Sequence, residues 1–214
     1  PSICSDEYGN LYVVYSDIVS GTWRIVVQKI SNNGMLLWGN STSDRIVANT
    51  VNYQAKPVYY NGSLFIAYYI GNNVRLRKLN ANTGADVWDV QVNTSGGANY
   101  YPDIVLGPDN YLYVAWLNNT SGVYNVYAQK INPSDGSRVV WGGNTSDKRV
   151  NQYTSYGSQT YWYGATEETV AVDMDSNTNL YVAFKLYRPE YGAKVFIQKV
   201  RADFGNFDRL WGDV

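Results

Sequence analysis

Histidine is absent from the 214 residues of this chain. Its absence removes the commonest general base, the usual zinc ligand and every Ser-His or Cys-His nucleophile pair. Cys4 is the single cysteine, so the sequence contains neither an intrachain disulfide nor a cysteine metal cluster. Its position in the first expected strand predicts a small buried hydrophobic residue.

Charge is also sparse, at 16% of residues with a formal net charge of −1. This balance gives no electrostatic reason to bind nucleic acid or an anionic membrane. No apolar run reaches the roughly 18 residues of a membrane span, and no signal peptide is present. The chain begins inside a repeat-like segment, which predicts a mature or excised piece. At 45% hydrophobic residues it can bury a core.

A seven-residue phrase recurs four times along the chain. It reads Gly-Asn-Leu-Tyr-Val-Val-Tyr at 9–15, and its other copies lie at 62–68, 110–116 and 178–184. A basic phrase follows each copy, with its lysine at Lys29, Lys78, Lys130 and Lys199. A tryptophan then closes each unit, at Trp38, Trp88, Trp141 and Trp211, with spacings of 50, 53 and 70 residues. Three markers in one register indicate a repeat architecture.

Each unit is expected to contain four short strands, because β-branched and aromatic residues dominate its runs. The first strands are expected at 2–4, 57–60, 102–106 and 169–172, and the second strands are the recurring phrases. Third strands are expected at 23–30, 73–79, 124–131 and 194–200, and each fourth strand ends at the tryptophan. Gly34, Gly84, Gly136 and Gly205 mark turns between the third and fourth strands. Helix content is expected to be close to zero.

Four-stranded antiparallel units of about 50 residues are what the blades of a β-propeller require. The sequence therefore predicts an all-β propeller of four blades, or a four-blade portion of a larger propeller. We expect a single domain with blades near 1–53, 54–98, 99–152 and 153–214. The longer fourth period places an insert near 151–169.

The repeat resembles the propeller blades of bacterial and archaeal cell-surface proteins. The third unit carries the likeness best, in Pro102-Asp103-Ile104, Leu112 to Trp116, Tyr127 to Ile131 and Trp141-Gly142. The resemblance covers nearly the whole chain. It implies the fold and says little about activity.

The insert is the first candidate binding surface. It contains five aromatic residues among small polar ones, and such residues make rigid, adaptable contacts with sugar rings or proteins. The alternative is a long loop that folds over the propeller rim and buries Trp162 for its own stability. The expected contact residues are Tyr153, Tyr156, Tyr161, Trp162 and Tyr163.

Calcium is the one candidate cofactor. Asp173, Asp175, Asn177 and Asn179 place oxygen side chains at every second position, as at the opening of a calcium loop. The loop lacks the central glycine and the terminal glutamate of an EF-hand. A plain hairpin turn is the competing interpretation.

Paired carboxylates are the remaining catalytic possibility, since five- and six-bladed propellers often host glycosidases. The candidate suppliers are Asp103, Glu167, Glu168 and Asp173. Glu167 and Glu168 are adjacent, so in a strand they would point to opposite faces. This reading is kept as the minority alternative.

Sequons suggest an extracellular location. In its low charge and its abundance of Asn, Ser and Thr, the chain resembles archaeal surface proteins, which are often N-glycosylated. Asn40, Asn93 and Asn144 follow a repeat tryptophan, so they are expected in exposed loops and to be modified before Asn61. The candidate acceptors are Asn40, Asn61, Asn93, Asn118, Asn119 and Asn144.

The main functional prediction is a non-catalytic scaffold or adhesion module at the cell surface, binding a protein or a glycan. It depends on the missing histidine and on the aromatic insert. One alternative is a self-assembling structural subunit of a filament or surface layer. The other is a carbohydrate-active hydrolase with the carboxylates named above.

Overall fold

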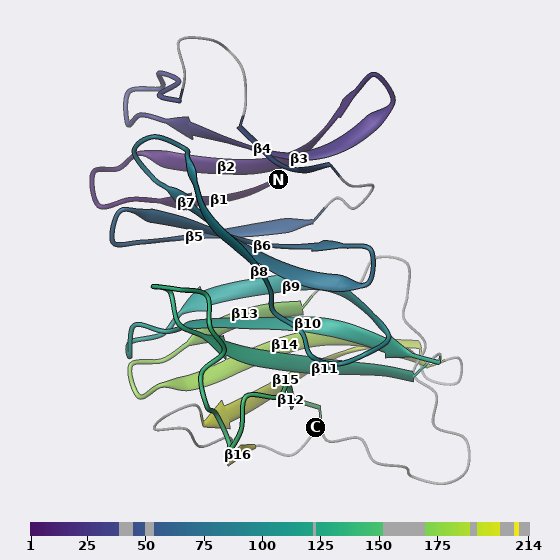
Figure 1. Ribbon diagram of the computed structural model, residues 1–214. Coiled ribbons are helices and arrows are strands. Elements are labelled where there is room, and N and C mark those ends of the chain that lie inside the picture. Colours follow the sequence, from purple (N-terminus) through teal and green to yellow (C-terminus); the bar gives the residue numbers. More distant parts are fainter. Residues whose placement is uncertain are drawn as a thin grey trace, which may run out of the picture. The chain divides into compact units, whose positions relative to one another are not determined.

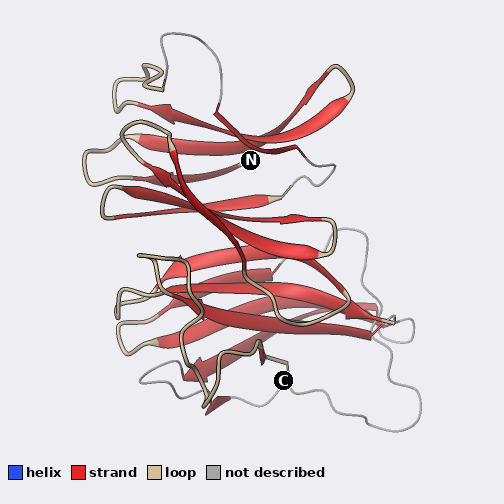
Figure 2. Ribbon diagram, in the orientation of Figure 1, coloured by secondary structure: helices blue, strands red, loops and turns tan. Residues whose placement is uncertain are grey.

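The structure is a computed structural model. It describes residues 1–38, 45–49, 54–121, 123–151, 170–188, 192–201 and 208–209. All regular elements in these ranges are strands, as the sequence predicts, and Figure 2 shows no helix. None of the described residues forms a helix long and apolar enough to cross a membrane.

The chain divides into two compact units, Pro1–Gln91 and Val92–Val214, and each contains two four-stranded sheets. In the first unit, blade 1 has the order β1-β2-β3-β4 and blade 2 the order β5-β6-β7-β8 (Figure 1). Their strands are β1 Ser2–Ser5, β2 Leu11–Val19, β3 Thr22–Ile30, β4 Arg45–Asn49, β5 Ala55–Tyr60, β6 Ser63–Ile70, β7 Asn73–Asn80 and β8 Asp86–Gln91.

The second unit repeats this arrangement. Blade 3 has the order β9-β10-β11-β12 and blade 4 the order β13-β14-β15-β16. Their strands are β9 Ala98–Leu106, β10 Leu112–Thr120, β11 Val123–Ile131, β12 Lys148–Arg149, β13 Val170–Met174, β14 Asn179–Arg188, β15 Gly192–Arg201 and β16 Asp208–Arg209. In both units all neighbouring strands are antiparallel.

The first three strands of each blade lie where the recurring phrases predict them, to within two residues at most ends. The turns between the third and fourth strands use glycine as expected. Gly34, Gly84 and Gly136 have positive φ angles of 86°, 71° and 76°, which glycine adopts without a steric penalty.

The fourth strands differ from the prediction. In blade 2 the strand contains Trp88 but continues to Gln91. In blades 1 and 3 the strand follows the tryptophan, as β4 after Trp38 and β12 after Trp141. The two indoles are buried instead of pairing at the edge of the sheet. In these blades the tryptophan is therefore a packing residue between blades.

Each unit has one core, formed between its two sheets. In the first unit, Tyr12, Val14 and Val27 of blade 1 pack with Leu64 and Ile66 of blade 2. In the second unit the equivalent residues of blades 3 and 4 form the same contact, through Tyr113, Ala115, Ala128, Leu180 and Val182. The innermost strands also lie together, β1 with β5 and β9 with β13.

Candidate functional site

The innermost strands of blades 3 and 4 carry two of the four acids expected for hydrolysis. Asp103 lies on β9 and Asp173 on β13. The Asp103 carboxylate joins the two strands, because its Oδ2 accepts a hydrogen bond of 3.0 Å from the backbone N–H of Val172 on β13. Its Oδ1 accepts another, of 2.9 Å, from the N–H of Ile104. Asp103 is half-buried and held in one orientation.

Asp173 lies in a different environment. Its side chain is exposed, and its Oδ1 accepts a 2.8 Å hydrogen bond from the N–H of Met174. Because Asp173 directly follows Val172, backbone dimensions keep its carboxylate within about 12 Å of that of Asp103. Glu167 and Glu168 lie outside the described residues, as do the five aromatic residues Tyr153, Tyr156, Tyr161, Trp162 and Tyr163.

The proposed calcium loop is built as a hydrogen-bonded turn. Asp175 Oδ1 accepts from the backbone N–H groups of Asn177 and Asn179 at 3.0 and 2.9 Å. Its Oδ2 accepts from Asn179 Nδ2 at 2.7 Å and from the Tyr181 hydroxyl at 3.1 Å. Burial alone would raise the pKa of Asp175, but these bonds outweigh it and hold that pKa below its ordinary value.

The Asp175 carboxylate therefore accepts the hydrogen bonds of its own turn, and both of its oxygens already have donors. Across the described ranges, no cluster of three or more His, Cys, Asp or Glu side chains is arranged to hold a metal ion. The turn accounts for the spacing of the oxygen side chains, because Asn179 donates to Asp175 through its backbone N–H and its Nδ2.

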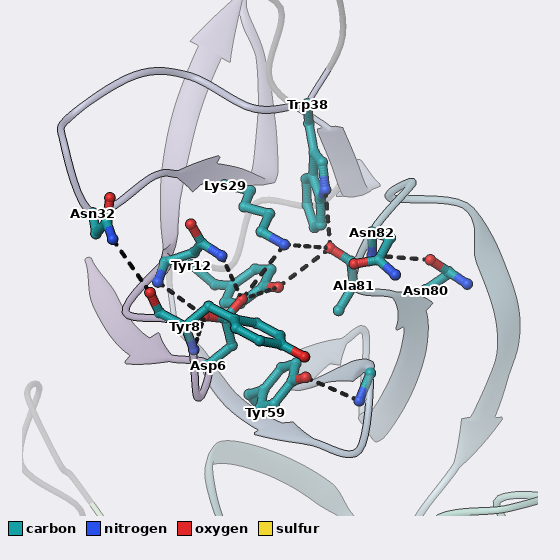
Figure 3. Close-up of polar contacts among 12 residues, drawn as sticks. Asp6, Tyr8, Tyr12, Lys29, Asn32, Trp38, Tyr59, Asn80, Ala81 and Asn82 are labelled. Carbon is teal, nitrogen blue, oxygen red and sulfur yellow. Dashed lines mark hydrogen bonds and ion pairs between the residues drawn. The ribbon is translucent and has the colours of Figure 1, made fainter.

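The same turn occurs in blade 1, where it is part of a buried polar cluster (Figure 3). Asp6 accepts from the N–H groups of Tyr8 and Asn10 at 3.0 and 2.9 Å, and from Asn10 Nδ2 at 2.9 Å. Its Oδ2 lies 3.2 Å from the Tyr12 hydroxyl and 3.5 Å from Lys29 Nζ. Burial would raise the pKa of Asp6, but the hydrogen bonds from Asn10, Tyr8 and Tyr12 lower it below its usual range.

All three repeat markers of blade 1 converge on one carbonyl of blade 2. The Ala81 oxygen lies 3.2 Å from the Tyr12 hydroxyl, 3.1 Å from Lys29 Nζ and 3.3 Å from Trp38 Nε1. Burial raises the pKa of Tyr12 far above its ordinary value, so the phenol stays protonated and can donate. The markers thus join blade 1 to the turn that begins blade 2's last strand.

Blade 3 has a similar cluster, but a residue at a different position provides the carboxylate. The position of Asp6 and Asp175, six residues before the tyrosine, is Gly107 in blade 3. Asp109 substitutes for it and accepts bonds of 2.7 Å from both the Tyr113 hydroxyl and Lys130 Nζ. In blade 2 the tyrosine is Phe65, which has no hydroxyl, and Lys78 Nζ lies 5.4 Å from its ring centre.

Gly107 gives a prediction with a matched control. A Cβ at this position would lie 2.5 Å from Asp109 Oδ1 and 2.7 Å from Tyr113 Cε2. Gly107→Ala should therefore lower the free energy of unfolding by about 1–3 kcal/mol. Gly96→Ala meets nothing within 4 Å and should be neutral or slightly stabilising. Urea unfolding of both variants tests this, and equal stabilities would contradict the close packing at Gly107.

The sequons fall into two groups. Asn61 and Asn144 are exposed, whereas Asn93 and Asn118 are buried and use their amides within the fold. Asn93 Nδ2 donates to the Ser95 carbonyl at 3.0 Å, and Asn118 Nδ2 donates to the Gly96 carbonyl at 2.7 Å. The expectation that Asn93 lies in an exposed loop is therefore wrong, because that segment folds back onto blade 3. Asn119 is half-buried, and Asn40 lies outside the described residues.

No family model and no curated protein matches the chain. Solved structures do match. An endo-arabinase from Bacteroides thetaiotaomicron superposes with a TM-score of 0.59 at 11% identity, over 100% of this chain and 80% of its own. The GH43 protein BlXynB from Bacillus licheniformis gives 0.58 at 14% identity, over 99% and 43%. An endo-1,5-α-L-arabinanase from Thermotoga petrophila gives 0.59 at 14% identity, over 99% and 58%.

These similarities establish the class of the fold. The four sheets are blades of a β-propeller, as the repeat predicts. The chain spans less than two thirds of the length of two of these three structures. The finer resemblance to blades of cell-surface proteins finds no support among them.

The comparisons overturn the main functional prediction. The structures that share the fold are an arabinase, an arabinanase and other glycoside hydrolases, not scaffolds, adhesins or filament subunits. The prediction of a non-catalytic protein gave too much weight to the missing histidine. Glycoside hydrolysis needs two carboxyl groups and no imidazole.

Proposed function

We propose that this chain is a carbohydrate-active hydrolase that cleaves glycosidic bonds in pentose-containing polysaccharides. The similar solved structures support this substrate class, since they include an endo-arabinase, an endo-1,5-α-L-arabinanase, an endo-1,4-β-xylanase and an α-L-arabinofuranosidase. The observation that carries the proposal is the Asp103 carboxylate, which bridges the innermost strands of two adjacent blades.

The surroundings of Asp103 suit one of the two roles that carboxyl groups have in glycoside hydrolysis. Glycosidases use one carboxylate that is ionised and one carboxylic acid that gives a proton to the leaving oxygen. Two backbone N–H groups donate to the two oxygens of the Asp103 carboxylate and hold it in place. It is therefore assigned the role of base or nucleophile, with no imidazole required.

The proton donor must come from a second acid nearby. Asp173 lies within backbone reach of Asp103, in a range that includes the separations of about 5 to 10 Å that hydrolases use. Glu167 and Glu168 are the other two acids near this strand in the sequence. Because of its position near Asp103, Asp173 is assigned the role of proton donor.

Asp103→Asn tests the proposal on activity. We expect release of reducing sugar from arabinan or xylan by the wild type, and a loss of at least about 100-fold in kcat for the variant, as for removal of one essential acid–base group. Asp135→Asn is the matched control, because Asp135 is an exposed turn residue bonded to Ser137. Melting curves of both variants separate lost catalysis from lost folding.

Two results would contradict the assignment. One is a folded wild type that releases no sugar from arabinan, xylan or their aryl glycosides. The other is an Asp103→Asn variant whose kcat equals that of the Asp135→Asn control.

A further inference from the structure

Tyr101 has an unusual backbone conformation in the middle of a strand. Among the described residues that lie inside strands, it alone has a positive φ angle, of 51°. A bulky side chain makes this conformation unfavourable, and the following Pro102 restricts the backbone of Tyr101 further. The other non-glycine residues with positive φ lie in turns between strands, at Ser20, Asn61, Asn110, Ser121 and Thr178.

A β-bulge accounts for this conformation. From Asp103 to Tyr100, β9 advances three residues, while β10 advances only two, from Ala115 to Leu117. A bulge residue with a left-handed backbone is usually glycine, and bulges of this kind re-aim side chains next to active sites. A strained tyrosine at a position that favours glycine points to a function of its side chain.

Tyr101 belongs to a group of three tyrosines. Its ring centre lies 5.9 Å from that of Tyr100, at an interplanar angle of 44°. Tyr124 on β11 lies near them, because burial and then the phenols of Tyr124 and Tyr101 raise the pKa of Tyr100. The Tyr100 phenol therefore stays protonated at neutral pH. All three side chains are half-buried, so each keeps part of its surface accessible.

This group lies beside Asp103. Tyr101 precedes Asp103 by two residues on β9, so backbone dimensions keep the two Cα atoms within about 7 Å of each other. The Asp103 carboxylate accepts its hydrogen bond from Val172 of blade 4. Tyr101, Tyr124 and Val172 all pack against the core between blades 3 and 4. The tyrosines and the carboxylate are therefore at the same contact between these two blades.

We propose that Tyr100, Tyr101 and Tyr124 bind a pentose ring of the substrate next to Asp103. The proposal rests on the proposed hydrolase function. Sugar rings have apolar C–H faces that pack on aromatic rings, and hydroxyl groups that form hydrogen bonds with phenols. Tyrosine supplies both contacts from a rigid side chain at a small entropic cost. This use of the ring explains why a strained tyrosine occupies the bulge.

Titration calorimetry with arabinopentaose and xylopentaose tests the proposal in the Asp103→Asn background, where the sugars are not cleaved. Tyr101→Gly removes the ring and suits the bulge, so it should weaken the affinity for the tighter-binding sugar about tenfold. Its melting temperature should change by less than about 3 °C, because relief of strain offsets the lost packing. Tyr101→Phe keeps the ring and should bind within about threefold of its parent.

Tyr127→Ala is the matched control. Tyr127 is also half-buried in blade 3, but its ring stacks on that of Trp116 with centres 6.3 Å apart, so its loss should leave the affinity unchanged. Tyr124→Leu fills a similar space without a ring or hydroxyl, and its loss of affinity supplies the test if Tyr101→Gly does not fold. Affinities equal to that of the control, or no binding of either sugar, would overturn the inference.

The result for hydrolysis is separate. An inactive wild type whose Asp103→Asn form binds these sugars through Tyr101 would contradict the hydrolase and retain the binding surface. An active wild type whose folded Tyr101→Gly variant has an unchanged KM would contradict the binding surface and retain the hydrolase.

Discussion

Tyr12→Ala should lower the free energy of unfolding of this protein by about 3–5 kcal/mol, the range for removing a buried aromatic side chain. Tyr12 is completely buried, and its ring lies 5.7 Å from that of Trp38 and 5.8 Å from that of Tyr59. Its loss would leave a cavity between blades 1 and 2. It would also remove the hydroxyl shared by Asp6 and the Ala81 carbonyl.

Tyr12→Phe separates these two contributions. It keeps the ring but removes the hydroxyl, leaving a buried carboxylate with one donor fewer, so we expect a loss of about 1–2 kcal/mol. Tyr8→Ala is the matched control, since Tyr8 is 72% exposed and contributes to the cluster through its backbone N–H and carbonyl groups; it should change stability by less than about 0.5 kcal/mol. Urea unfolding followed by fluorescence measures all three, and a Tyr12→Ala variant as stable as Tyr8→Ala would show that the cluster does not hold the blades together.

The strands were predictable because their signal is local. Alternating apolar residues and turn glycines determine where β1 to β3 and their counterparts begin and end. The fourth strands of blades 1 and 3 were not predictable in this way. Tryptophan is a residue type common in strands, but Trp38 and Trp141 are buried between sheets. Their partners are residues such as Tyr12 and Tyr113, with ring centres 5.7 and 5.5 Å away. That choice depends on tertiary packing.

The polar cluster shows the same limit for site residues. The sequence reveals that Tyr, Lys and Trp recur together, but not that they meet at the carbonyl of Ala81 in the next blade. Asp175 has the spacing of a metal ligand, yet its oxygens bind the donors of its own turn. A weak signal was present: Asp6 and Asp175 stand at the same distance before their tyrosines.

The main functional prediction was wrong for a different reason. The absence of histidine excludes imidazole chemistry, but a propeller can support hydrolysis with carboxylates contributed by separate blades. Asp103 was named as a candidate from the sequence, whereas its bond to Val172 of the next blade became visible only in the structure. Residues that meet across blades leave no spacing pattern along the chain.

Asn99→Ala should cost about 3 kcal/mol or more, because it removes the acceptor at the centre of a buried network in blade 3. Asn99 is completely buried, and its Oδ1 accepts from Trp116 Nε1 at 2.8 Å and from Asn118 Nδ2 at 2.9 Å. The Ser95 hydroxyl lies 3.2 Å from the same oxygen. Each buried donor left without its acceptor costs about 1–3 kcal/mol.

A double-mutant cycle measures how much of this cost comes from the lost hydrogen bond between Asn99 and the Trp116 indole. Trp116→Phe removes the donor, so in the Asn99→Ala background it should destabilise less than in the wild type. Asn82→Ala is the matched control, since Asn82 is exposed and takes part in its turn through its backbone N–H; its stability should stay within about 0.5 kcal/mol of wild type. Additive costs for Asn99→Ala and Trp116→Phe would mean that the short contact between these side chains contributes nothing, and that Asn99 stabilises blade 3 through its backbone-directed bonds to Ser95 and Gly97 instead.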